Sequence, residues 1–268
     1  LNASLKASAV GLGEVANIAD LATSAMNAYG SDTLTASGAT DVLVAAVREG
    51  KLSAEELAGS MGSVLPTASA LGVSFNDVGA AMAAMSRTGT DAAQGATQLN
   101  AILMGIAKTG PAQDKAFKAM GLSAAGLRKE IKEKGLLSVI KTLKTGLDGN
   151  TKAATVLFPN IRALKGVLDL TGKGAAANAV IFKNMENVLN DTQKAFDKNA
   201  QSAGFKLTKA LNTAKESFSQ MGAVLLQSLL PLIQDLAGVI TRIFGAFNSL
   251  DVNMQRFISA VGVLAIAL

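Results

Sequence analysis

Three residue types are missing from the chain, which has no cysteine, no histidine and no tryptophan in its 268 residues. Without thiols and imidazoles, the sequence excludes cysteine nucleophiles, imidazole acid–base catalysis, and thiolate or imidazole metal ligands. A carboxylate-only metal site is still compatible with the composition, but most hydrolase and redox chemistries are not. The lack of cysteine also means that the redox compartment cannot be read from the sequence. We therefore expect no enzyme, no cofactor and no metal site.

Aromatic and charged residues are scarce, at 4% and 17% of the chain, whereas charged residues usually make up about 25%. Hydrophobic residues nevertheless reach 49%, with a mean hydropathy of +0.33, so alanine, leucine and valine supply most of the apolar content. Small and unbranched side chains favour closely packed helices over sheets, and no segment alternates as a strand does. The predicted fold is all-α: a compact multi-helix domain, then long helices and an apolar C-terminal helical region.

Helix start and stop signals divide the first 174 residues. Thr35 or Ser37 is predicted to start a helix that ends near Gly50. Ser53 and Glu56 form a capping box, in which the two side chains satisfy two free backbone amides. Further starts are predicted at Ser74, at Thr90 or Asp91, at Pro111 and at Ser123, and further ends or breaks at Pro66, Gly72, Gly89, Lys108, Gly121, Gly135, Gly149 and Pro159.

Charge is unevenly placed along the chain. Residues 1–107 carry four Lys and Arg against nine Asp and Glu, whereas residues 108–215 carry nineteen against eight. The basic zone could contact DNA or anionic lipid without sequence preference. Four segments are predicted: an N-terminal helical segment (1–40), a helical core domain (41–174), a long basic amphipathic helix (175–215, unbroken from about Ala175 to Asn199) and an apolar helical region (216–268).

The apolar region has a periodic polar stripe. Eighteen uncharged residues separate Glu216 from Asp235, which is close to the length that spans a bilayer. Polar residues recur every seven positions, which returns to nearly the same helix face: Gln220, Gln227, Gln234, Thr241 and Asn248. The candidate membrane or helix-packing surface comprises Leu225, Leu229, Leu232, Leu236, Val239, Ile243, Phe247, Val261 and Leu264. Three interpretations remain: a buried helix in a bundle, a latent membrane segment and an interfacial helix.

Catalytic patterns are present only as isolated matches. Ser138 and Lys141 fit a Ser-x-x-Lys nucleophile pattern, but the partner motifs of such enzymes do not follow it. Glu130 and Glu133 are close in sequence, but they lie among basic residues and are interpreted as a solvated, charged helix face. Neither pair is predicted to form a catalytic site.

The ends of the sequence suggest a longer parent chain. The first residue is Leu1 rather than Met, and the last twelve residues, 257–268, are uncharged. We expect the chain to be part of a longer polypeptide, and we find no basic start followed by an apolar core that would mark a signal peptide.

Several short motifs, each of low specificity, occur in a recognisable order between residues 41 and 172. The segments are Gly50-Lys-Leu-Ser-Ala-Glu-Glu-Leu-Ala58, Leu65-Pro-Thr-Ala-Ser-Ala-Leu-Gly-Val-Ser74, Ala80-Ala-Met-Ala-Ala-Met85, Gly89-Thr90, Ala96-Thr-Gln-Leu-Asn-Ala101, Phe117-Lys-Ala-Met-Gly-Leu122 and Leu157-Phe-Pro-Asn-Ile-Arg-Ala-Leu164. In this order they resemble the core region of phage tail tape measure proteins. The long helix and the apolar end that follow are also similar to the layout of that family.

The resemblance implies a structural virion protein that sets tail length during assembly and takes part in genome ejection. It implies a homo-oligomer, which we take as a trimer, and partners among the tail tube and tail tip or baseplate proteins. It also implies contact with the host inner membrane on ejection. The expected locations are the virion tail, the host cytoplasm during assembly and, transiently, the host membrane. A helical pore-forming toxin or bacteriocin-like module is the alternative that the apolar end alone favours.

Overall fold

The computed structural model describes residues 1–159 and 161–202, followed by shorter stretches: 205–206, 208–209, 212–213, 215–216, 234–235, 237–242, 244–252 and 254–255. Contacts divide the chain into two units, Leu1–Gln201 and Ser202–Leu268.

The described residues are helical and contain no strand, so the all-α prediction is confirmed. In the first unit the helices are α1 (Asn2–Ala9), α2 (Val15–Tyr29), α3 (Ala36–Glu49), α4 (Ala54–Met61), α5 (Leu65–Leu71), α6 (Phe75–Arg87), α7 (Ala92–Ala107), α8 (Pro111–Ala119), α9 (Ala124–Leu147), α10 (Thr151–Leu157), α11 (Ile161–Thr171), α12 (Ala175–Met185) and α13 (Asp191–Ala200).

Most of the local helix signals act as predicted. The capping box of α4 forms in both directions, because the Glu56 amide donates to Ser53 Oγ and the Ser53 amide donates to the Glu56 carboxylate. Pro66 does not break a helix; it lies in the first turn of α5, where a missing N–H leaves no hydrogen bond unmade. The chain is already non-helical before it, at 62–64.

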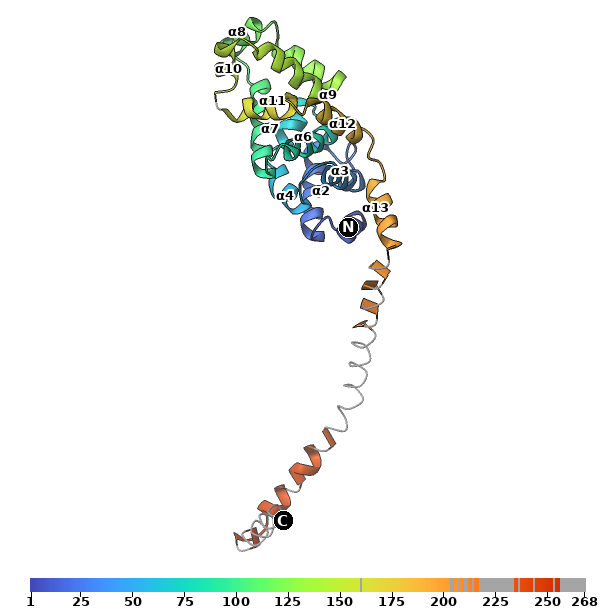
Figure 1. Cartoon of the computed structure of the whole chain (residues 1–268). Helices are drawn as coiled ribbons and strands as arrows, with labels where there is room; N and C mark the ends of the chain where they lie inside the picture. Colours follow the sequence, from blue (N-terminus) through green and yellow to red (C-terminus); the bar gives the residue numbers. More distant parts are fainter. Residues whose placement is uncertain are drawn as a thin grey trace. The chain divides into compact units, whose positions relative to one another are not determined.

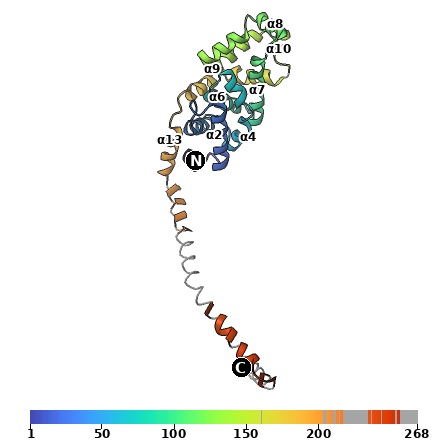
Figure 2. The same ribbon diagram turned by 180° about the vertical axis from the view of Figure 1, so that it is seen from behind.

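Helix α6 lies in the middle of the first unit and contacts α3, α7, α11 and α12 (Figures 1 and 2). Every residue from Val78 to Ser86 is buried, and four of them are alanines. Because alanine adds little width, neighbouring helices can approach α6 from several sides. This explains how a chain with few aromatic residues still builds a large core.

The prediction of one helix from Ala175 to Asn199 is wrong. The chain leaves helical geometry after Met185 and starts α13 at Asp191. The nearest physical reason is Asn190, whose φ of 63° lies in the left-handed region that interrupts a right-handed helix. No glycine or proline in this stretch signals the break.

Helix α9 is two helices joined at Gly135, where φ is 78° and ψ is 175°. The hydroxyl of Thr142 donates to the Glu130 carboxylate over 3.0 Å, although residues twelve apart would be about 18 Å apart in a straight helix. The two halves, 124–134 and 136–147, therefore fold back on each other as a helical hairpin. The predicted separation at Gly135 is confirmed.

Candidate functional site: an apolar helical segment and a lysine-lined hollow

The second unit contains helical stretches at 237–242 and 244–248. Their apolar side chains are open to solvent in the single chain: Val239 is 48% exposed, Ile240 46% and Phe244 63%. Ile240, Phe244 and Phe247 are spaced by four and three residues, which is the spacing of one face in a continuous helix. The segment therefore presents an uncovered apolar face.

Only part of the predicted surface falls on described residues. Val239 is exposed and Phe247 is half-buried. The other predicted positions lie outside the described residues: Leu225, Leu229, Leu232, Leu236, Ile243, Val261 and Leu264. Whether the nine residues form one surface stays a prediction.

The polar stripe is partly described. Gln234, Thr241 and Asn248 are all exposed. The Thr241 hydroxyl donates to the Ala237 carbonyl one turn earlier, over 2.8 Å, so its own helix satisfies this polar group. Gln220 and Gln227 lie outside the described residues.

Sequence reasoning missed Ile240 and Phe244 as members of the apolar face, because it followed a narrower series through Val239 and Ile243. The sequence shows that both residues are apolar, but their exposure could be determined only from the structure. Within the described stretches, no helix has both the length and the apolarity needed to cross a bilayer.

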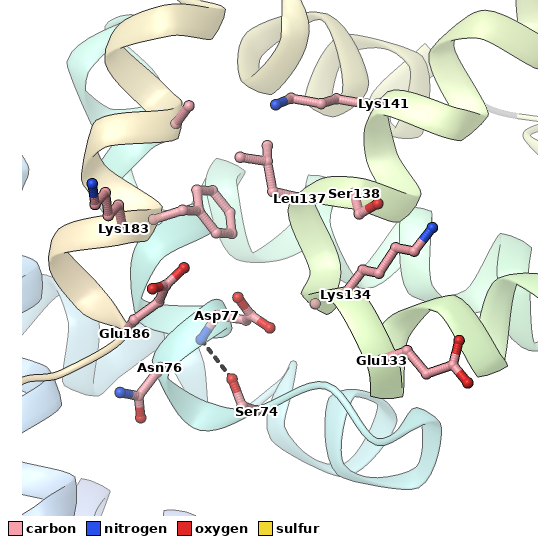
Figure 3. A pocket seen from close by; sticks show the side chains of 13 residues that line it. Ser74, Asn76, Asp77, Glu133, Lys134, Leu137, Ser138, Lys141, Lys183 and Glu186 are labelled. Carbon is pink, nitrogen blue, oxygen red and sulfur yellow. Dashed lines mark hydrogen bonds between the residues drawn. The ribbon is translucent and has the colours of Figure 1, made fainter.

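The first unit contains a hollow of about 730 Å³ where α6, α9 and α12 meet (Figure 3). Lys134 and Lys141 line it from α9, and Lys183 lines it from α12, with Lys141 and Lys183 on facing sides. None of these three lysines forms an ion pair with the described residues. Three carboxylates, those of Asp77, Glu133 and Glu186, line the same hollow, so its formal charges balance without direct ion pairs to the lysines.

Asp77 lines the same hollow and holds the hairpin of α9. Its carboxylate accepts the Leu136 amide over 3.2 Å, which caps the second half of the hairpin from a different helix. Burial raises the pKa of Asp77 above its usual value, and the nearby Glu186 adds to this rise, while the Leu136 hydrogen bond opposes it. Asp77 is thus a structural carboxylate, and sequence reasoning did not single it out.

Ser138 and Lys141 both line the hollow, but they are not coupled to each other. The Ser138 hydroxyl donates to the Glu130 carboxylate over 2.6 Å. Glu130 also accepts from Thr142 and is half-buried, so its interpretation as a solvated charge is wrong. The fold-back at Gly135, which the sequence pattern could not place in space, is the reason. In the part of the chain described here, no three acidic side chains gather as a metal site.

Comparison with known proteins gives one consistent result. A family model described as "Phage-related minor tail protein" matches residues 1–158, which is more than half of the chain. The "Tape measure protein" of Pneumococcus phage Dp-1 is 25% identical over 260 residues, covering 95% of this chain and 22% of the relative. The "Probable tape measure protein" of Clostridium phage phiCD119 is 27% identical over 202 residues, covering 74% of this chain and 21% of the relative.

The chain thus spans about a fifth of the length of these two curated relatives. No solved structure matches it. The family match begins at the first residue and runs through α1 to α10, so it covers most of the first unit. The chain belongs to the phage-related minor tail protein family.

Proposed function

We propose that this chain is part of a tape measure protein, a structural component of the virion that sets tail length during assembly and takes part in genome ejection. The observation that carries the proposal is the match of residues 1–158 to the minor tail family. The names of the two relatives add to it. A non-enzymatic role is consistent with a chain that has no histidine or cysteine.

A ruler needs a constant length per residue, and a helix supplies it at about 1.5 Å per residue. In-frame deletions in an extended helical region of the parent protein are expected to shorten the tail by about 15 Å for every ten residues removed. Deletions within 41–172 are expected to impair assembly instead, because they remove packed helices such as α6 and α7. Electron microscopy of the particles measures both results.

A matched pair of deletions of equal length, one in each region, provides the control. Equal and proportional shortening from both would contradict the division into a ruler and a compact domain. An unchanged tail length after deletion of the extended region would contradict the tape measure function itself.

The apolar face of the second unit is proposed to be covered in the particle by the other two copies of a homotrimer, or by tail tube and tail tip proteins. On release the same face would be free to enter the host inner membrane. An exposed apolar surface of this kind favours association or insertion. Non-specific contact of the basic zone with DNA is a further part of this proposal, supported by the charge of residues 108–215.

Membrane binding can be tested on Phe244, which is 63% exposed. Phe244→Arg is expected to weaken binding to vesicles about tenfold or more, because an arginine near a bilayer centre costs about 2.5–3.5 kcal/mol on insertion scales. The matched control is Asn248→Arg, which adds the same charge on the exposed polar stripe and is expected to change binding little. Vesicle co-sedimentation measures both.

If both variants bind vesicles as well as the unmodified chain, the face is a packing surface only. If the unmodified chain alone makes vesicles leak, the pore-forming alternative gains support over the tape measure function.

A further inference from the structure

The break between α12 and α13 runs against the local sequence. Residues 175–200 contain no glycine and no proline, and they include six alanines, three lysines and five asparagines. Alanine and lysine favour helix, and asparagine is a weaker helix former but does not by itself end one. The chain nevertheless leaves helical geometry between Met185 and Asp191, and groups elsewhere in the fold stabilise the break beside the left-handed Asn190.

Two side chains from the central helices stabilise the break. At the end of α12, the side-chain amide of Asn76 donates to the Met185 carbonyl over 2.7 Å. At the start of α13, the Asp41 carboxylate accepts the amides of Asn190 and Thr192, each over 2.9 Å. These bonds satisfy backbone groups that the break would otherwise leave unpaired.

The carboxylate of Asp41 is buried and bonds to the connection between α12 and α13. Asp41 is only 3% exposed, and among the described residues its hydrogen bonds are those from Asn190 and Thr192. A buried carboxylate needs such partners, because an unpaired buried charge is strongly unfavourable. The break and the burial of Asp41 therefore depend on each other.

The rest of α13 is attached by several polar contacts and by the partly buried Ala195, which packs against the core. Within the helix only Asp191 and Thr192 are buried. Arg48 pairs with Asp191, Lys6 donates to the Gln193 side chain, and the side-chain amide of Asn199 donates to the Ala9 carbonyl. Val188, before the helix, is the buried apolar anchor of the connection. Few apolar contacts and many polar ones at the surface are typical of segments that open locally.

We propose that residues 186–201 form a releasable strap with two states. In the docked state described above, Asp41 and Asn76 hold the break. In the released state the strap leaves α1 and α3, and residues 186–190 become helical, which fuses α12 with α13. A continuous helix over 175–200 would be about 39 Å long. Both conformations belong to this chain whether or not it acts as a tape measure.

The left-handed residue Asn190 allows a direct test. Alanine disfavours the left-handed conformation of the docked state and favours a continuous helix, while glycine does the opposite. Asn190→Ala and Asn190→Gly are therefore expected to differ by about 30-fold or more in the equilibrium between the two states.

The docked state can be measured by crosslinking, because the chain has no native cysteine. Val10 and Lys198 line one hollow between the first part of the chain and α13. In a Val10→Cys, Lys198→Cys background, a short bis-maleimide, which adds to both thiols without an oxidant, should link the two positions only while α13 is docked. We expect fast crosslinking with Asn190→Gly, slow crosslinking with Asn190→Ala and a stronger helical circular dichroism signal in the alanine variant.

Equal crosslinking in the two variants would overturn the proposal. Hydrogen exchange of the unmodified chain gives a second test that requires no substitution. The amides of Asn190 and Thr192 should exchange through an opening that leaves α6 protected. If they exchange only together with α6, the strap is part of one cooperative unit and does not release.

Discussion

Phe117→Ala is expected to lower the free energy of unfolding by about 3–5 kcal/mol, the usual range for removing a fully buried phenylalanine. Phe117 is 0% exposed and lies in α8, where Ala116 is the only other buried residue. The ring therefore supplies most of the apolar attachment of α8, and its loss leaves a cavity beside α10, the helix that α8 contacts. Urea unfolding followed by circular dichroism measures the change.

The neighbouring Lys118→Ala is the matched control. Lys118 is exposed, so its truncation is expected to change the free energy of unfolding by less than about 0.5 kcal/mol. A similar small effect from Phe117→Ala would show that α8 is not held by this ring. An altered slope of the unfolding curve would show that α8 detaches separately from the rest of the unit.

Gly105→Ala is expected to destabilise the protein by about 1–3 kcal/mol, because it forces overpacking. A Cβ atom at this position in α7 would overlap the Phe158 ring, with Cδ1 at 2.7 Å, and would lie 3.2 Å from the Leu157 carbonyl oxygen. Phe158 is 3% exposed, so the ring has little room to move. The expected result is a lower midpoint in thermal unfolding.

Gly59→Ala makes the same chemical change with the opposite expected sign. Gly59 lies within α4, and nothing approaches the place of its Cβ within 4 Å. Alanine should therefore stabilise the helix by about 0.4–1 kcal/mol. If the two alanine variants shift the unfolding midpoint in the same direction, the close approach of Phe158 is not the reason why position 105 requires glycine.

The parts of the fold that were predictable from the sequence are those whose cause is local. Ser53 and Glu56 are three residues apart, and the capping box they form is present. Gly135 separates two helices because its own backbone adopts a positive φ. In both cases the residues that decide the structure lie within one turn of the helix boundary that they set.

The parts that could not be predicted are those decided by distant side chains. The break before Asp191 depends on Asp41, about 150 positions earlier. The role of Glu130 depends on the fold-back that brings Ser138 and Thr142 to it. The apolar character of residues 237–248 was predictable from the sequence. Which side chains in this segment are exposed, Ile240 and Phe244 among them, could be determined only from the structure.

The long-range capping by Asp41 and Asp77 also bears on the order in which the chain folds during synthesis. Asp41 lies in α3 and caps α13, and Asp77 lies in α6 and caps the second half of α9. In each case the helix that carries the carboxylate leaves the ribosome before the helix that it caps. Synthesis at about 5–20 residues per second gives the early helices time to pack first. When the first turns of the later helices emerge, their backbone amides meet carboxylates that are already in place. The boundaries of the later helices are therefore set by residues that were synthesised earlier.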